Sequence, residues 1–219
     1  MTVLKDGSNL LVHLAPAPVV LRVATFTALI RGNGLPWLER EVSLISYLAG
    51  VGASVMPPSD LVPPGPHIVG GWAMSAWQFV DHERGIVPDP LTALRAIQFG
   101  VDREVIGAGA ADELRGRRDS LLEDLLSSAP EIQAQHGDAF PRNSLVTKTG
   151  VVWIDFEDCC SGPLLWDLAT LIRQGGGEQV AAVVRARFGD VAMRNAIALR
   201  QVQVDVWNIL HDARQINGW

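Results

Sequence analysis

A predicted β-hairpin in the second half of the chain has polar side chains at the end where its two strands open. Residues 144–148 and 151–155 are short runs rich in branched residues, on either side of a turn. Asp138 and Asn143 lie just before the first strand, and Asp155 ends the second. An antiparallel hairpin brings these positions together, and their oxygens would suit Mg²⁺ with one carboxylate left as a base. A turn in which Asp and Asn cap backbone N–H groups is the alternative.

Strand and turn patterns alternate in the first part of the chain. Residues 10–14 and 18–24 predict two strands joined by a tight connection, and 67–80 predicts two more that meet at a glycine turn. One helix is expected between these pairs, over 36–49, with proline in its first turn and glycine just past its end. We therefore predict a small, mostly β lobe over residues 1–80.

The remainder of the chain, residues 81–219, is predicted to be mainly helical. A polar stretch broken by glycine and proline follows residue 80 and suits a linker. The hairpin is expected to be the one interruption of this helical lobe. Helical patterns cover the ranges 90–99, much of 102–128, 163–174, 178–188 and 190–213.

The helix predicted over 36–49 carries an acidic residue on its apolar face. At 100° per residue, Leu38, Ile45 and Leu48 fall within about 60° of Glu41. A carboxylate on a buried face costs several kcal/mol unless a cation lies near it. Glu41 therefore predicts either a buried cationic partner or a lobe interface at which the carboxylate reaches solvent.

Composition narrows the partners and the compartment. The 219 residues include 18 basic and 24 acidic ones, a net charge of −6, so no global positive field is available to hold a nucleic acid. The two cysteines are adjacent, at Cys159 and Cys160, and match neither a disulfide framework nor a zinc spacing. No apolar run is long enough to cross a membrane. We expect a cytoplasmic protein that binds neither nucleic acid nor membrane.

Two motifs give the chain a resemblance to a known family. The first is His136-Gly137-Asp138 followed by Asn143. The second consists of Ile154, Asp155, Phe156, Glu157, Gly162, Pro163, Trp166, Asp167, Leu168 and Ala169. In this order and at this separation they resemble the motifs of the aminoglycoside phosphotransferase and choline kinase family, which has a protein-kinase-like fold. The resemblance implies an α+β, two-lobed fold with a small β-rich N-lobe, shortened at its N-terminus, and a mainly helical C-lobe.

The resemblance also implies roles for single residues. Asp138 would be the catalytic base or orient the acceptor hydroxyl, and Asn143 and Asp155 would bind Mg²⁺. Arg22 would be the phosphate-binding cation and Glu41 the carboxylate that holds it. An Arg22 side chain that reaches solvent from an edge strand is the alternative. The residues expected to cover the nucleotide phosphates are Gly7, Ser8 and Asn9.

The expected reaction is transfer of the γ-phosphoryl group of ATP, with GTP not excluded, to the hydroxyl of a small molecule bound with Mg²⁺ between the lobes. His136 would brace the catalytic loop and Asp167 would anchor it. One alternative is a catalytically degenerate module that binds a nucleotide or a partner. Another is a Mg²⁺-dependent hydrolase, which would leave Arg22 and Glu41 unexplained. The catalytic loop lacks a second His and a Gly common in the family, and the helical lobe is short, so the sequence defines neither the acceptor nor the oligomeric state.

Overall fold

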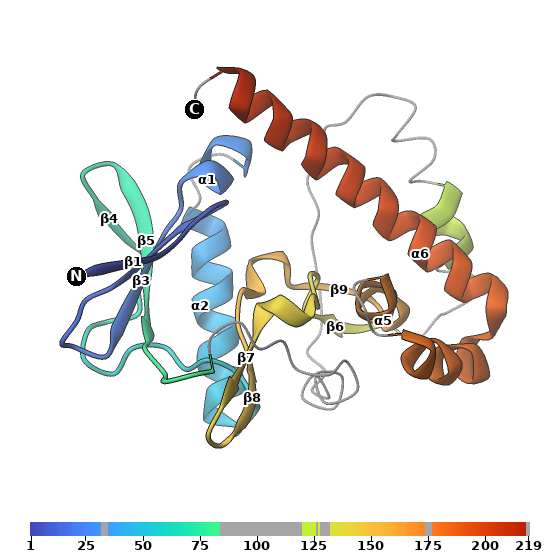
Figure 1. Cartoon of the computed structure of the whole chain (residues 1–219), viewed down its shortest axis with the longest axis horizontal. Coiled ribbons are helices and arrows are strands. Elements are labelled where there is room, and N and C mark those ends of the chain that lie inside the picture. The colour runs from blue at the N-terminus through green and yellow to red at the C-terminus, as the bar shows by residue number, and fades with distance from the viewer. Residues whose placement is uncertain (32–34, 84–119, 126, 128–131, 174–176, 218–219) are drawn as a thin grey trace. The chain divides into compact units, whose positions relative to one another are not determined.

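The computed structural model describes residues 1–31, 35–83, 120–125, 127, 132–173 and 177–217. It divides into two compact units, shown in Figure 1. Unit 1 consists of Met1–Val87 and Ser144–Glu157, and unit 2 of Pro88–Asn143 and Asp158–Trp219. Within the described ranges, no helix is both long and apolar enough to span a bilayer. The predicted helix at 90–99 and most of the one at 102–128 lie outside the described residues, although 120–125 is helical.

An antiparallel five-stranded sheet in the order β1-β2-β3-β5-β4 forms the body of unit 1. Its strands are β1 (Thr2–Asp6), β2 (Leu10–His13), β3 (Val19–Val23), β4 (His67–Val69) and β5 (Trp72–Gln78). The four strands predicted within residues 1–80 are confirmed, whereas β1 was not predicted, because all five of its residues are exposed and carry no burial pattern.

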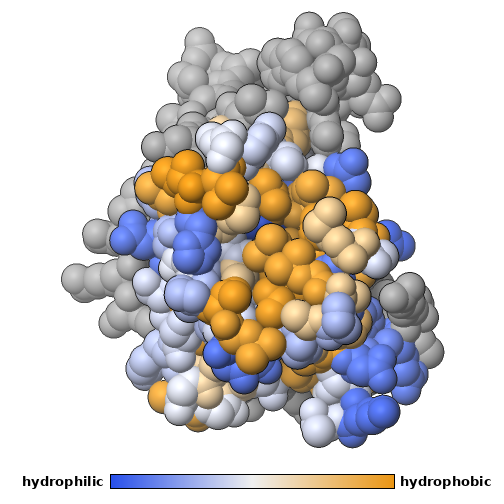
Figure 2. All heavy atoms as spheres, turned by 90° about the vertical axis from the view of Figure 1, so that its left-hand side faces the viewer, coloured by the Kyte–Doolittle hydropathy of each residue, from blue (hydrophilic) through white to orange (hydrophobic). Residues whose placement is uncertain are grey.

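Two helices follow β3, the short α1 (Phe26–Arg31) and the longer α2 (Leu35–Gly50). The helix predicted over 36–49 is confirmed as α2, which packs against β5. Ala24, Leu38 and Ala73 form a core cluster at this side of the sheet. Figure 2 looks at unit 1 from the side on which the sheet lies in Figure 1, and apolar side chains gather on this face. The exposed apolar residues of unit 1 include Val3, Leu61, Ile68, Val69 and Trp72.

The predicted hairpin is present as β7 (Ser144–Thr147) and β8 (Gly150–Trp153), and it belongs to unit 1. Trp153, which is 1% exposed, donates its backbone N–H to the Ser54 carbonyl at 2.9 Å, and its own carbonyl accepts from Met56 at 2.8 Å. These contacts explain why the compact units differ from the predicted lobes 1–80 and 81–219. The hairpin lies in the second lobe by sequence but is bonded to the loop that follows α2.

Unit 2 combines a two-stranded sheet with helices. Antiparallel β6 (Ile132–Gln135) and β9 (Cys160–Pro163) frame the loop that carries the first motif, and neither strand was predicted. Helix α5 (Leu165–Leu171) packs against α6 (Gly177–Asn217). Gly189 interrupts α6 with φ +81° and ψ +165°, where the sequence predicts one helix to end at 188 and another to begin at 190. The helical character of this part of the chain is therefore confirmed.

Candidate active site

A buried ion pair joins the sheet of unit 1 to α2. Glu41 lies on the apolar face of α2 among Leu38, Val42, Ile45 and Leu48, and it is 2% exposed. Arg22, in the middle of β3, is 5% exposed. Its Nη1 donates to both carboxylate oxygens of Glu41, at 2.5 and 2.6 Å. The predicted pairing of Arg22 with Glu41 is therefore confirmed, and the alternative of two solvent-directed side chains is wrong.

The second terminal nitrogen of Arg22 binds two further carboxylates. Nη2 lies 2.7 Å from Oδ1 of Asp155 and 2.5 Å from Oε2 of Glu157. Burial alone would lower the pKa of Arg22, but the carboxylates of Glu157, Glu41 and Asp155 outweigh it and raise that pKa. Glu157 was matched by sequence as part of a motif but given no role. Its position two residues after Asp155 was the signal that could have assigned it.

The guanidinium of Arg22 contacts three carboxylates, those of Glu41, Asp155 and Glu157, and the pKa of Glu41 reflects both its burial and these neighbours. Burial raises the pKa of Glu41 to about 7, with Asp155 and Glu157 adding to the increase and Arg22 opposing it. Burial is the largest cause of this increase, and repulsion from Asp155 and Glu157 is a smaller one that a cation bound near them would reduce.

The raised pKa of Glu41 predicts that stability depends on pH. The folded-state pKa of about 7 exceeds the ordinary value of 4.5, so the folded protein binds more protons than the unfolded chain between these values. This stabilisation is complete below about pH 4.5 and is lost as the pH rises through about 7. Because Gln does not titrate, we expect the unfolding free energy of wild type to fall relative to that of Glu41→Gln as the pH rises over this range. Urea unfolding at several pH values measures it, and two parallel pH curves would contradict the assignment.

The turn between β1 and β2 is tied to the same cluster. Asn9 is buried, and its Nδ2 donates to Oε2 of Glu157 at 3.2 Å, while its Oδ1 accepts from the Thr27 hydroxyl. The Gly7 N–H donates to the Asn9 carbonyl at 3.2 Å, and the Ser8 carbonyl accepts from the Thr27 N–H at 3.0 Å. The structure thus connects the predicted phosphate loop to Glu157. Contacts of Gly7, Ser8 and Asn9 with phosphates stay a prediction.

Helix α2 holds the segment 155–157 by two consecutive residues. Glu41 acts through Arg22, and Arg40 donates from Nη2 to the Glu157 carbonyl at 2.7 Å. The guanidinium of Arg40 lies 4.4 Å from the ring centre of Trp37, which limits its orientation. The position of α2 therefore determines where the acidic side chains of this segment lie.

Asp155 stands in a backbone conformation that few side chains adopt. Its φ is +68°, in the left-handed region, where Asp is one of the tolerated residues. Within the described ranges, no three His, Cys, Asp or Glu side chains are gathered as a metal-binding group. Mg²⁺ is commonly bound by one or two carboxylates together with phosphate oxygens and water. Asp155 and Glu157 supply two hard oxygen donors in an acidic cluster, so their chemistry fits such an ion.

The first motif forms a loop in unit 2 that α5 anchors. Asp167, 1% exposed, accepts from the backbone N–H of His136 at 2.6 Å and of Gly137 at 3.0 Å. Burial raises the pKa of Asp167, against the opposing effect of His136 and these hydrogen bonds. Gly137 has φ +84°, and a Cβ there would lie 1.9 Å from the Asp158 carbonyl oxygen. The predicted anchoring by Asp167 is confirmed, and only glycine fits at position 137.

Asp138 and Asn143 are brought together within this loop. The Nδ2 of Asn143 donates to Oδ2 of Asp138 at 2.8 Å and to the Asp138 carbonyl at 3.0 Å. Because Nδ2 faces Asp138, Oδ1 is the atom of Asn143 that could coordinate a cation. The Asp138 N–H lies 3.3 Å from Nδ1 of His136, consistent with the bracing role predicted for that histidine.

Arg200 completes the surroundings of Asp138, and the sequence analysis did not identify it as a site residue. Its Nη2 donates to Oδ1 of Asp138. No motif includes Arg200, and its one signal is an arginine among apolar residues of a helix. Its buried apolar neighbours along the helix are Ala196, Leu199 and Val202.

The predicted site residues fall into the two units. Unit 1 brings together Asn9, Arg22, Glu41 and Asp155, and unit 2 brings together Asp138 and Asn143. We also predicted that one cleft holds Asp138, Asn143 and Asp155. This statement involves both units and stays a prediction.

An antiparallel sheet joined by Arg22–Glu41 to a helix, with a separate helical unit that carries the His-Gly-Asp loop, is the architecture of a protein-kinase-like phosphotransferase. The family model described as "Phosphotransferase enzyme family" matches residues 8–199. The chain belongs to this family of small-molecule phosphotransferases. No curated protein matches the chain by sequence.

Solved structures share the fold at low sequence identity. The choline kinase LicA from Streptococcus pneumoniae is 14% identical, with a TM-score of 0.62 over 100% of this chain and 87% of its own. The amicoumacin kinase hAmiN is 14% identical, with a TM-score of 0.67 over 97% of this chain and 80% of its own. A microcompartment-associated aminopropanol kinase is 18% identical, with a TM-score of 0.62 over 94% and 82%. These likenesses show the fold, α+β and kinase-like as predicted.

Proposed function

We propose that the chain transfers the γ-phosphoryl group of ATP, in the presence of Mg²⁺, to a hydroxyl group of a small molecule. One observation carries the proposal: the buried Arg22 holds three carboxylates, those of Glu41, Asp155 and Glu157, in one cluster. Such a cluster suits a cation that arrives with a nucleotide. The amicoumacin kinase that shares the fold was solved with AMP-PNP and Ca²⁺, which agrees with this choice of ligands.

The residues of unit 1 would hold the nucleotide. Asp155 and Glu157 would bind the divalent ion together with Asn143, and the ion would neutralise charge on the phosphate oxygens. Arg22 would then exchange a carboxylate for a phosphate oxygen, because its planar fork of donors suits either partner. Glu41 would keep the guanidinium in place during this exchange through the two bonds to Nη1.

Asp138 would act on the acceptor. Its carboxylate accepts a hydrogen bond from the acceptor hydroxyl and takes the proton as that oxygen attacks the γ-phosphorus. A new oxygen–phosphorus bond forms while the bond to the β,γ-bridging oxygen breaks. The products are a phosphomonoester and ADP, and no covalent intermediate forms with the protein. The expected setting is the cytoplasm, with no role for nucleic acid or membrane.

Ligand-induced stabilisation and turnover test the proposal. Thermal unfolding is followed with Mg·ATP, Mg·GTP, ATP with a chelator, and Mg²⁺ alone. We expect Mg·ATP at 100 times its Kd to add about 2.7 kcal/mol and the chelated nucleotide to add much less. Release of ADP is then measured with choline-like alcohols, aminoglycosides, amino alcohols and sugars as acceptors.

Three outcomes would count against the proposal in different ways. Stabilisation by Mg·ATP without turnover on any acceptor would favour a module that binds nucleotide without catalysis. The absence of stabilisation by any nucleotide would remove the phosphotransferase assignment for this chain. Turnover with water alone at the rate seen with every acceptor would favour a hydrolase.

A further inference from the structure

Arg200 is a buried arginine of helix α6, and its presence there is not explained by a contribution to the stability of the helix. It is 6% exposed, and buried apolar residues precede and follow it on the helix: Ala196, one turn before it, Leu199 and Val202. Its Nε is buried and has no hydrogen-bond partner among the described residues. A buried donor without a partner costs stability, so an apolar side chain would suit this position better. The terminal nitrogens of Arg200 must therefore explain why arginine is present.

Those nitrogens bind the loop that carries Asp138. Nη2 donates to Oδ1 of Asp138, and Nη1 donates to the Gly137 carbonyl at 3.2 Å and to Oε1 of Gln203. Trp166 donates from Nε1 to the same Gly137 carbonyl at 2.9 Å, and its ring centre lies 5.5 Å from the guanidinium carbon of Arg200. The planar guanidinium of Arg200 thus binds the backbone of Gly137 and the side chain of Asp138, two successive residues of the loop.

The carboxylate of Asp138 is therefore fixed from two sides. Arg200 holds Oδ1, and Asn143 holds Oδ2 from within the loop at 2.8 Å. With both oxygens bonded, the carboxylate cannot rotate about its bond to Cβ without breaking one bond. Each oxygen keeps a further lone pair, and the side chain is 29% exposed, so it can still accept from a hydroxyl.

We propose that Arg200 is a positioning residue that fixes the Asp138 carboxylate for the acceptor hydroxyl. This inference rests on the proposed function. Arg200 lies one residue beyond the segment 8–199 that matches the family. Arginine suits the task better than lysine, because a single guanidinium can bind the Asp138 carboxylate and the Gly137 carbonyl at once.

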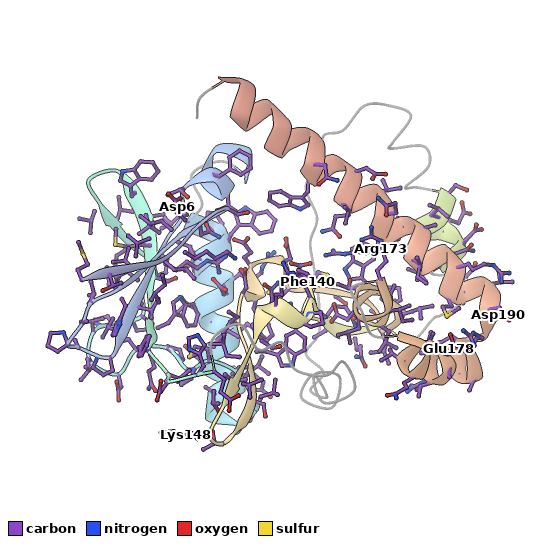
Figure 3. All side chains as sticks on the ribbon, in the orientation of Figure 1. Asp6, Phe140, Lys148, Arg173, Glu178 and Asp190 are labelled. Atoms are coloured by element: carbon purple, nitrogen blue, oxygen red, sulfur yellow. The ribbon has the colours of Figure 1, made fainter. Side chains whose placement is uncertain are left out.

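The test compares Arg200→Met with Arg173→Met in the full chain. Arg173, labelled in Figure 3, is a partly buried arginine of unit 2 whose recorded hydrogen bond is to Gln201 of α6 and not to Asp138. We expect Arg200→Met to lower kcat about 10²-fold with the KM for ATP unchanged, the scale on which misplacement of a reacting group acts. Millimolar guanidinium chloride should restore part of the rate to this variant only. Arg200→Lys should retain an intermediate rate.

A readout without nucleotide separates this inference from the proposed function. Hydrogen exchange of the amides 136–143 should be faster in Arg200→Met and unchanged in Arg173→Met. If the wild type shows no turnover, the proposed function fails. If hydrogen exchange is unchanged in Arg200→Met, Arg200 does not hold the loop in solution, and the inference fails on its own. If exchange changes but kcat falls no more than in Arg173→Met, or guanidinium restores nothing, Arg200 has a structural role and the inference is wrong.

Discussion

Replacement of Arg22 by Met should lower the free energy of unfolding by about 3–5 kcal/mol, the scale for removing one partner of a buried ion pair. The substitution keeps most of the side-chain volume and removes the guanidinium that binds Glu41, Asp155 and Glu157. Glu41, at 2% exposure, would be left buried and without that partner. The loss should be partly masked at low pH, where Glu41 binds a proton.

Urea unfolding measured at pH 8 tests this prediction. Arg194→Met is the matched control, because Arg194 is exposed and its substitution should change stability by no more than about 0.5 kcal/mol. The double variant Arg22→Met with Glu41→Met should recover much of the loss, since both members of the buried pair are then replaced by apolar groups. A double variant as unstable as the sum of the two single ones would show that the pair is not coupled.

Glu41 shows how much of this site the sequence contains. A carboxylate centred on an apolar helix face is a local conflict that a buried cation or access to solvent can resolve, so one helix alone predicts a tertiary contact or an interface. The structure supplies that contact at 2.5 Å from Arg22. The glycine break at 189 and the proline in the first turn of α2 were likewise predictable, because backbone conformation at such positions depends on one residue.

Arg200 shows what the sequence does not contain. It is separated from Asp138 by 62 residues, and no spacing rule connects a position on a long helix to a loop so far away. Strands β6 and β9 were missed for a related reason: each has four residues, and they pair across the whole catalytic loop and hairpin. Short elements stabilised by distant partners carry too little local pattern to be predicted.

The register of the hairpin also departs from its prediction in a way that matters for Asp155. The strands pair Thr147 with Gly150, so the turn consists of residues 148–149, and β8 ends at Trp153. Asp155 therefore lies two residues beyond the strand, where its φ of +68° turns the chain into the short helix at Phe156–Asp158. A prediction based on strand pairing alone placed Asp155 within the second strand. In the structure its side chain reaches Arg22 from a position beyond that strand.

Replacement of Asp155 by Ala should abolish stabilisation by Mg·ATP and turnover together, whereas Asp138→Asn should leave nucleotide binding intact. Asp155 is the carboxylate of the acidic cluster with the more exposed side chain, at 28% against 12% for Glu157, so it is the better placed to meet an arriving cation. Without Asp155 the cation would lose its principal ligand, and the negative charge on the phosphate oxygens would no longer be neutralised. Asp138 acts on the acceptor, so Asp138→Asn should lower the transfer rate by about 10² or more with little change in affinity for ATP.

The two variants are compared in the same thermal-shift titration and ADP-release assay. Asp60→Ala and Asp190→Asn are the controls, because both residues are exposed and lie outside the described clusters, and each should resemble the wild type. Asp155→Ala should still fold, since Arg22 retains Glu41 and Glu157 as partners. Tight Mg·ATP binding by Asp155→Ala would move the cation site to other residues. An Asp138→Asn protein that transfers phosphate at the wild-type rate would show that the acceptor hydroxyl needs no carboxylate, because an amide at the same place can still orient a hydroxyl but cannot take its proton.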